Sequence, residues 1–398
     1  PVVEHARRFG DDLEALLPNG ASSARITRET DWASVSPSAL DQLVASMGSL
    51  ARGLEAAADA TESAEAGSLR PDASDAVEEV RSRQAAWVEL EQALRSVTRL
   101  EERDAAFFVD RDERGAPKLN RRPLRVGEAF RAQVLSLCDR TLLTSATLLA
   151  ENDFTPFLES LGLAEDEVET AELPSPFPLA RQVRSAVFQG PEPTDPAFVA
   201  RLADLVVGLA SGVRRNTLVL LTSYQMLEDL AARVAAPLSR AGVKLLRQEA
   251  GEPAGPLAEE FREGRGAVLL GTASFWEGVD FPGAALEVLV VARLPFSVPT
   301  DPLVAARSEQ IELAGGDAFR DLLLPEAVLR FRQGIGRLIR TATDRGAVIV
   351  ADSRIARAGY GRSFRATLPT EPVVERAPEI LIEEIARWFA EETTACPA

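Results

Sequence analysis

The chain has 398 residues, of which 46% are hydrophobic, so we expect two or three globular units with sizeable cores. Its formal net charge of −17 excludes a generally basic protein that coats nucleic acid, but it leaves room for a local groove that binds phosphates. Cys138 and Cys396 are the two cysteines, too few for a disulfide framework, a zinc centre or an iron–sulfur cluster made by this chain alone.

Cysteine usage of this kind fits a reducing cytoplasm, and we expect a cytoplasmic protein. No run reaches the roughly 18 apolar residues of a membrane span, and no signal peptide is visible, so no membrane partner is expected. The chain begins with proline rather than methionine, which suggests a fragment or a processed product.

The N-terminal part, residues 1–122, is predicted to be an all-helical insert rather than a sheet. It is rich in Ala, Leu, Glu and Arg, and its apolar residues recur at helical spacing over 38–60 and 75–104. Residues 61–74 between these helices have the composition of a loop, and so do the basic residues 111–126.

From Val126 the pattern becomes α/β, and we treat residues 123–172 as a second segment. It is predicted to hold a helix over 130–139, a short buried strand over 140–147 and a helix over 154–163. A proline-rich linker over 173–182 then opens the third segment, residues 173–398.

In the third segment short apolar strands alternate with helices, which predicts a parallel sheet with helices on both faces. The predicted strands lie within 216–223, 243–248, 266–272, 286–296 and 346–352. The predicted helices cover 195–211, 224–242, 256–264, 326–340 and 379–392.

Unusual residues follow several of these strands, where the chemistry of a doubly wound sheet gathers. "TSATL" at 144–148 offers hydroxyl groups to a phosphate, or simply caps the next helix. Thr222, Ser223 and Tyr224 stand at a strand-to-helix turn whose free amides suit an anion, although capping also explains the serine.

A longer loop, "GTASFWEGVDFPG" at 271–283, joins two predicted strands and holds an aromatic residue and two acids. A connection of this length without a helix pattern is typical of a functional loop. For Trp276 and Phe281 we leave open whether they serve the site or anchor the core.

The segment "FRQGIGRLIR" at 331–340 places glycines beside arginines. If it is helical, Gln333, Gly336, Arg337 and Arg340 share one face. Glycine would let a ligand or a backbone approach closely, and two guanidinium groups suit an anion with several oxygens, such as a triphosphate.

Taken together and in this order, "TSATL", "LLTSY", "GTASFWEGVDFPG" and "QGIGRLIR" resemble motifs III to VI of superfamily 2 helicases. "ARLPFSVPTDPLVAAR" and "VIVADSRI" strengthen a resemblance to the DinG/XPD-like group in particular. The resemblance runs from about Leu124 to Ile355, and the N-terminal helices match only the position of that group's arch domain.

The resemblance implies two RecA-like lobes that bind ATP and Mg²⁺ between them while single-stranded DNA crosses their top. Gln333 and Arg337 would face the γ-phosphate, and Arg340 would be the arginine finger. The residues that border the nucleotide and couple its binding to the other lobe and to DNA would be Glu277, Gly278, Asp280, Gly336, Ser145 and Thr147. The DNA backbone would contact Thr222, Ser223, Tyr224, Gly271, Thr272, Ser274 and Trp276.

Several parts that the group uses have no counterpart here. The chain has no GxxxxGK[ST] and no intact DExH, although Glu4 and His5 vaguely resemble the end of a DEAH box. Cluster-binding cysteines would precede that box, so the chain says nothing about an iron–sulfur cluster. The expected identity is a C-terminal portion of a helicase: arch, tail of lobe 1 and complete lobe 2.

The first hypothesis is therefore an ATP-dependent DNA helicase acting on single-stranded and on forked or tailed duplex DNA, moving 5′ to 3′ by resemblance, with a role in DNA repair. This chain alone would lack ATPase activity, and a monomer is favoured. The alternative is a non-catalytic module that binds single strands or a partner. A Rossmann-type enzyme is disfavoured because no GxGxxG follows the first strand.

Overall fold

The computed structural model of the chain describes most of the sequence. The described residues are 1–17, 22–27, 30, 38–65, 71–100, 102, 104–112, 114–145, 147–149, 153–276 and 278–391. Two compact units emerge: the first comprises Pro1–Leu137 and Val298–Gly316, and the second comprises Cys138–Ser297 and Asp317–Ala398. Among the described residues, no helix is both long enough and apolar enough to cross a membrane.

The first unit combines helices with a small antiparallel sheet in the order β1-β2-β3. Its core includes Phe9, Met47, Phe107 and Val109, which are all buried. The elements are α1 (Val2–Glu14), β1 (Ser23–Ile26), α3 (Ala39–Glu65), α4 (Pro71–Arg99), β2 (Ala105–Arg111), β3 (Pro117–Pro123), α5 (Gly127–Gln133), η1 (Leu135–Leu137) and α12 (Pro302–Leu313).

The two long helices of the first unit confirm the helical periodicity, but the prediction of an all-helical insert is wrong. Residues 111–126, predicted to be a loop, hold the end of β2 and all of β3, which pair from Ala105↔Pro123 to Arg111↔Pro117. The predicted strand at 140–147 is also absent from its described residues. Leu142 there is 88% exposed, so it has no apolar surface to pack against.

The second unit is built on a seven-stranded parallel sheet, which confirms the predicted α/β class. The strand order is β10-β4-β9-β8-β5-β7-β6. The strands are β4 (Val183–Phe188), β5 (Thr217–Leu220), β6 (Leu245–Arg247), β7 (Val268–Gly271), β8 (Val288–Val291), β9 (Gly346–Val350) and β10 (Val373–Glu375). The strands β4 and β10 were not predicted, because they follow proline-rich segments.

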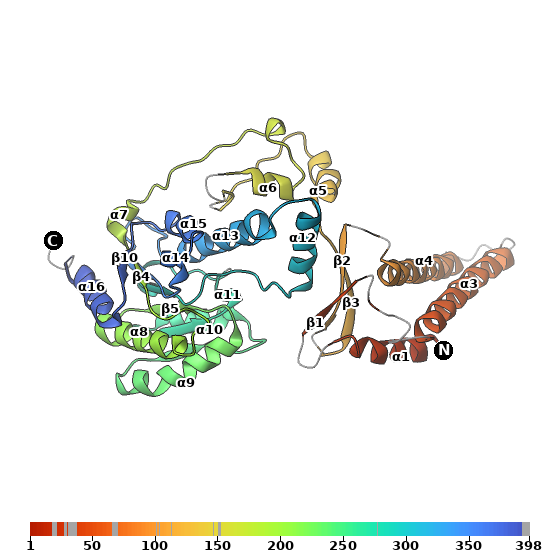
Figure 1. The fold of residues 1–398 in the computed structure, drawn as a ribbon. Helices are drawn as coiled ribbons and strands as arrows, with labels where there is room; N and C mark the ends of the chain where they lie inside the picture. Colours follow the sequence, from red (N-terminus) through yellow and green to blue (C-terminus); the bar gives the residue numbers. More distant parts are fainter. Residues whose placement is uncertain are drawn as a thin grey trace. The chain divides into compact units, whose positions relative to one another are not determined.

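Helices cover both faces of this sheet (Figure 1). One face packs against α8 (Phe198–Val213), α9 (Tyr224–Arg240) and α16 (Pro378–Glu391). The other face packs against α10 (Ala254–Glu263), α11 (Ala273–Trp276), α13 (Leu324–Ile335), α14 (Arg354–Arg357) and α15 (Gly361–Ala366). The remaining elements of the unit are α6 (Thr155–Ser160), η2 (Glu165–Glu167), α7 (Leu179–Gln182), η3 (Gly283–Ala285) and η4 (Phe319–Leu323).

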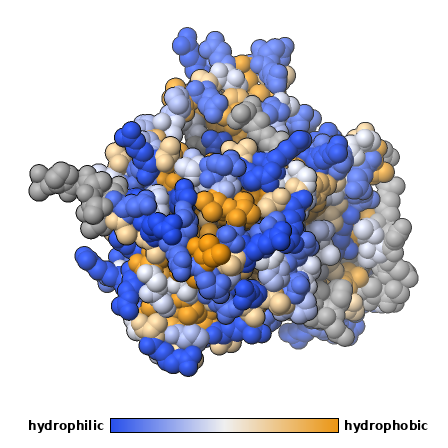
Figure 2. All heavy atoms as spheres, turned by 60° about the vertical axis from the view of Figure 1, so that its left-hand side comes forward, coloured by the Kyte–Doolittle hydropathy of each residue, from blue (hydrophilic) through white to orange (hydrophobic). Residues whose placement is uncertain are grey.

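The central strands consist almost wholly of Val, Leu and Ile, and all four residues of β8 are fully buried. Burial on both faces is what a parallel sheet requires of its strands. Figure 2 shows one face on which hydrophilic residues predominate, with smaller apolar patches between them.

The register of the central strands aligns their carboxyl ends. Leu220 at the end of β5 lies opposite Gly271 of β7 and Val291 of β8. Arg247 at the end of β6 pairs with Leu270. The segments after β5, β6 and β7 therefore meet at one edge of the sheet.

Helix α13 approaches this edge closely because it has a glycine where it meets α11. A Cβ on Gly334 would lie 2.7 Å from Cε3 of Trp276, a contact that real side chains do not make. Trp276 is 2% exposed, and its Nε1 donates to the carbonyl of Leu221 at 3.1 Å. The glycine thus serves packing: it leaves room for the indole ring between α13 and the end of β5.

Gly334→Ala is expected to lower the free energy of unfolding of the second unit by about 1–3 kcal/mol, because the new methyl group overlaps a ring that is fixed on its other side. Urea denaturation followed by tryptophan fluorescence measures the change. Gly255→Ala in α10 is the control, since an added Cβ there has no neighbour within 4 Å. Equal stability of the two variants would contradict the packing argument.

Candidate functional site

The segments that follow β5, β6 and β7 form a connected set of hydrogen bonds. Gln248, directly after β6, is 3% exposed. Its Oε1 accepts from the backbone N–H of Thr272 at 2.8 Å and from the Thr272 hydroxyl at 2.9 Å. Its Nε2 donates to the hydroxyl oxygens of Tyr224 at 2.9 Å and Ser274 at 2.7 Å. We call Gln248, Tyr224, Thr272 and Ser274 the Gln248 network.

The Gln248 network joins three residues that the sequence pointed to through one that it did not. Tyr224 and Ser274 are exposed, whereas Thr272 is buried. Gln248 was overlooked because a single glutamine after a three-residue strand carries no pattern. Its position directly after the last residue of a strand was the one available signal.

The turn into α9 is capped from within. Ser223 has an extended backbone, and its Oγ accepts from the backbone N–H of Met226 at 3.3 Å. The capping alternative for this serine is therefore confirmed. Thr222 beside it is exposed, as is Tyr224. Thr222, Ser223 and Tyr224 stand together at the start of the helix.

The loop after β7 is anchored in the core. Trp276 and Phe281 are buried, which decides the open alternative for both residues in favour of core packing. The prediction that Trp276 contacts nucleic acid is therefore wrong for its side chain. Gly271 is buried at the strand end, where Phe275 fills the space that a Cβ would need. Glu277 lies outside the described residues, and Gly278, with φ +91°, is exposed.

The helical face predicted for residues 333–340 does not exist, because α13 ends at Ile335 and Gly336 is its C-cap. Arg337 turns inward and is 5% exposed. Its Nε donates to the carbonyl oxygen of Trp276 at 3.0 Å, and its Nη1 donates to that of Val279. The prediction that Arg337 faces a phosphate is therefore wrong in this structure: its guanidinium holds the loop after β7.

Arg340 points the other way, toward solvent. Its side chain is 43% exposed, and its Nε lies 2.9 Å from Oδ1 of Asp280, which is 64% exposed. An ion pair this exposed contributes about 1 kcal/mol or less, so separating it costs little. Arg340 can therefore exchange Asp280 for another anion.

The backbone beneath Arg340 is fixed by Asp344, which is buried. Its Oδ2 accepts from the backbone N–H groups of Arg340 at 2.6 Å and Thr341 at 2.8 Å, and its Oδ1 accepts from the Thr341 hydroxyl. Burial raises the pKa of the Asp344 carboxyl, but the hydrogen bonds from Thr341 and from the backbone outweigh it and hold the pKa below its ordinary value.

Gln333, on the last turn of α13, meets the segment predicted to sense the nucleotide. Its Nε2 donates to Oγ1 of Thr147 at 3.3 Å. The backbone N–H of Thr147 donates in turn to Oγ of Ser145 at 3.2 Å. The structure thus brings Gln333, Thr147 and Ser145 together. Glu4 and His5 lie in α1 of the first unit, where Glu4 pairs with Arg8 and His5 Nδ1 lies 3.1 Å from Ser46 Oγ.

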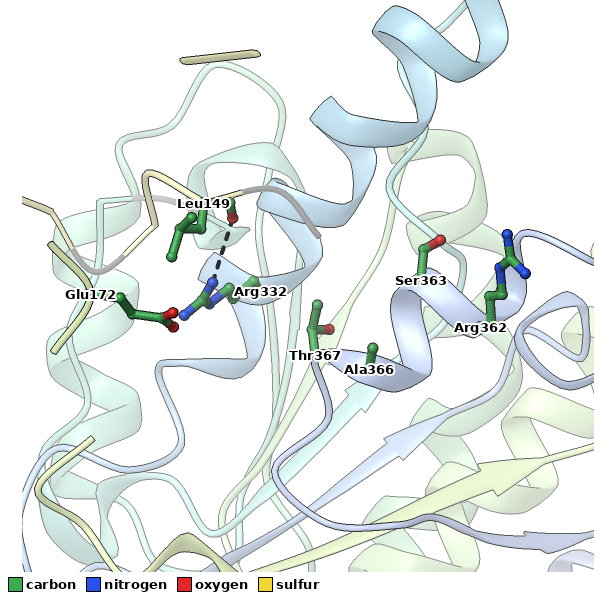
Figure 3. Close-up of a pocket in the computed structure, with 7 residues that line it drawn as sticks. All are labelled: Leu149, Glu172, Arg332, Arg362, Ser363, Ala366 and Thr367. Carbon is green, nitrogen blue, oxygen red and sulfur yellow. Dashed lines mark hydrogen bonds between the residues drawn. The ribbon is translucent and has the colours of Figure 1, made fainter. Parts of the chain in front are cut away.

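A pocket of about 530 Å³ opens beside α13 and α15. Figure 3 shows Arg332 reaching toward Glu172 and the carbonyl of Leu149, while Arg362 extends away from them on α15. Ser363, Ala366 and Thr367 complete its lining. The pocket mixes an acid with two arginines and includes neither Arg340 nor the Gln248 network, so it is separate from both.

Known proteins resemble parts of this chain in sequence. Residues 206–371 match the family described as the helicase C-terminal domain. The chain is 38% identical to the 3′-5′ exonuclease DinG of Bacillus subtilis (strain 168) over 68% of its own length and 30% of that protein. It is 36% identical to the ATP-dependent DNA helicase YoaA of Escherichia coli (strain K12), over 63% of its own length and 38% of that protein.

An XPD helicase structure has the same fold, with a TM-score of 0.55 at 14% identity over 94% of this chain and 62% of that one. The domain match and the sequence similarity to DinG and YoaA support a C-terminal region of a DinG/XPD-like superfamily 2 helicase, and the XPD structure supports the fold. It spans 30% to 38% of the length of the two curated relatives named above.

The helicase C-terminal domain match contains most of the residues described above. Gln248, Thr272, Arg337, Arg340 and Asp344 all fall within the matched residues 206–371. Ser145 and Thr147 precede the match. The Gln248 network and the two arginines therefore lie within the matched domain, and the segment that Gln333 contacts lies before it.

In this helicase region, Asp344→Asn is expected to lower the free energy of unfolding by about 1–3 kcal/mol at pH 7, because a carboxylate that accepts several hydrogen bonds is lost. The pKa of Asp344 is depressed on folding, so its contribution is present above the pKa of the unfolded chain and is lost as pH falls through the folded value. Urea unfolding at pH 7 and at successively lower pH values below 5 checks both points.

The difference between wild type and Asp344→Asn should shrink as the pH falls. Asp204→Asn is the control, because Asp204 is exposed on α8 and, within the described residues, pairs with Arg201 of the same helix. A difference for Asp344→Asn that stays constant with pH would rule out the carboxylate as its source.

Proposed function

We propose that the protein to which this chain belongs is an ATP-dependent DNA helicase, which couples ATP hydrolysis to translocation on single-stranded DNA and to duplex unwinding. The observation that carries the proposal is that one α/β unit presents both an exposed, weakly paired arginine, Arg340, and a set of exposed hydroxyl groups where β5 and β7 end. The helicase names of the relatives and the matched domain support it. We favour helicase over the exonuclease activity named for the Bacillus relative, because the matched segment is the helicase domain.

For the nucleotide, the chain fits only one side of a site. Arg340 offers a guanidinium in an exposed and weakly held ion pair, which suits the charge that builds on a transferring phosphoryl group. A glycine-rich cradle with its lysine is missing from the sequence, and among the described residues no cluster of His, Cys, Asp or Glu could hold a metal ion. ATP and Mg²⁺ would therefore be held mainly by another lobe, and Arg340 would complete the site from this one.

Gln333 is proposed to link that nucleotide side to the segment at Ser145 and Thr147, through its hydrogen bond to Thr147. Asp280 holds Arg340 until a phosphate takes its place. Arg337 has a positioning role: it fixes the backbone on which Asp280 stands, through the carbonyl oxygens of Trp276 and Val279.

For the strand of DNA, the proposed surface is the exposed set Thr222, Ser223, Tyr224 and Ser274. Hydroxyl groups and the amides at the start of α9 bind phosphates without reading sequence, and the Tyr224 ring can stack on a base. By family resemblance, the proposal also includes movement 5′ to 3′, forked or tailed DNA substrates, a monomeric state, a cytoplasmic location and a role in DNA repair.

In the full-length protein, Arg340→Ala is expected to reduce DNA-stimulated ATP turnover by about 10³-fold or more. Single-strand affinity should change by less than about threefold, because Arg340 is not assigned to the DNA surface. Phosphate release and fluorescence anisotropy measure the two quantities. Arg357→Ala is the matched control, since Arg357 has the same exposure of 43% and a weak pair with Glu192 at 3.7 Å. Retained turnover in Arg340→Ala would refute the finger role.

The chain by itself is expected to bind an oligo-dT strand but to show no ATP turnover above background, because it supplies the arginine without the phosphate cradle. A phosphate-release assay on the purified chain, with and without oligo-dT, measures this. Turnover that disappears in Arg340→Ala would show instead that the chain holds a complete site. A full-length protein that binds strands but never hydrolyses ATP would favour the alternative, a non-catalytic strand-binding module.

A further inference from the structure

We infer that Gln248 is a positioning residue that turns the hydroxyl groups of Tyr224 and Ser274 into outward hydrogen-bond donors for the phosphates of a single strand. The inference rests on the proposed DNA surface. It explains why that surface would bind the anionic phosphate backbone of a strand. It follows from which atoms of the Gln248 network donate and which accept.

The orientation of the Gln248 side-chain amide is settled by a backbone group. The N–H of Thr272 can only donate, and it lies 2.8 Å from Oε1 of Gln248. A flipped amide would place its NH₂ group against this N–H, two donors facing each other. Nε2 must therefore be the atom that faces Tyr224 and Ser274.

Every hydrogen-bonding position of the buried amide is then used. Oε1 accepts twice, both times from Thr272, and the two N–H bonds of Nε2 go to Tyr224 and Ser274. A glutamine amide has two donors and two acceptor lone pairs, so none remains. Because the side chain is 3% exposed, water has little access to compete with these bonds.

This arrangement fixes the orientation of the Tyr224 and Ser274 hydroxyl groups. Each accepts a hydrogen bond from Gln248, so its own hydrogen must point elsewhere. Within the described part of the chain, neither the Tyr224 nor the Ser274 hydroxyl has another hydrogen-bond partner, and both residues are exposed. The two hydroxyl hydrogens are therefore presented to solvent from loops that follow different strands.

A phosphodiester offers only acceptors, so donors in fixed positions are what it needs. Ser274 follows β7 and Tyr224 opens α9 after β5, and Gln248 after β6 ties the two together. The network thus sets both the spacing and the polarity of the pair. The ligand class is the sugar–phosphate backbone of a single strand, with no preference for base sequence.

The test uses fluorescence anisotropy of the chain with labelled oligo-dT at one fixed salt concentration, since phosphate binding depends on salt. Tyr224→Phe and Ser274→Ala each remove one exposed hydroxyl group, and each is expected to weaken binding by about three- to tenfold. On a methylphosphonate dT strand, whose linkages are uncharged, the same variants should bind within about twofold of the unaltered chain.

Gln248→Glu keeps the shape of the side chain but replaces its two donors by a carboxylate oxygen. The hydroxyl hydrogens of Tyr224 and Ser274 would then turn inward, and binding is expected to fall by about tenfold or more. Gln225→Glu, at an exposed position next to Tyr224, adds the same charge without touching the network and should change the affinity by less than about threefold. In the Gln248→Glu background, Ser274→Ala should have no further effect.

The outcomes separate the inference from the function on which it rests. If the unaltered chain binds oligo-dT but Tyr224→Phe and Ser274→Ala bind it equally well, the inference fails and the proposed DNA surface stands. Equal losses on the phosphodiester and methylphosphonate strands would also overturn it, because the hydroxyl groups would not be reading charge. If the unaltered chain binds no single strand, the proposed function fails and the inference falls with it.

Discussion

The buried guanidinium of Arg337 is the interaction on which the rest of the sheet edge depends. A charge removed from water is costly unless strong hydrogen bonds replace hydration, and here backbone carbonyl oxygens of Trp276 and Val279 accept them. These bonds tie the end of α13 to the loop after β7. Because Arg's planar fork reaches two carbonyls at once, lysine could not hold the loop in the same way.

Arg337 and Arg340 are close in sequence but have different roles: Arg337 is buried and holds the loop after β7, whereas Arg340 is exposed. The helix ends at Ile335, so Arg337 and Arg340 are not successive residues of one helical face. Asp344 captures the backbone N–H groups of Arg340 and Thr341, and this turn sends the Arg340 side chain outward to Asp280. The inward arginine thus holds the backbone that carries the partner of the outward one.

Much of the second unit could be predicted from sequence because its strands are short, apolar and separated by helices with clear periodicity. β5, β7, β8 and β9 lie where apolar runs predict them. β2 was missed because its alternation is brief and lies in a segment rich in helix formers, although Phe107 and Val109 face the core. Short edge strands such as β10 gain their stability from neighbouring strands, and sequence alone does not show those neighbours.

For the candidate site, sequence could suggest residues but not the direction of their side chains. It grouped Tyr224 with Ser274, which the structure links through Gln248, but helical spacing wrongly placed Arg337 and Arg340 on one face, because spacing cannot show where a helix ends. It also cannot show which partner of a hydrogen bond is the donor. Tyrosine, serine, threonine and glutamine side chains can each donate or accept.

In the Gln248 network the backbone N–H of Thr272 can only donate, and it therefore determines which atoms of the network donate and which accept. This N–H is in position only because β6 and β7 are adjacent parallel strands. The polarity of the exposed hydroxyl groups is therefore a property of the fold.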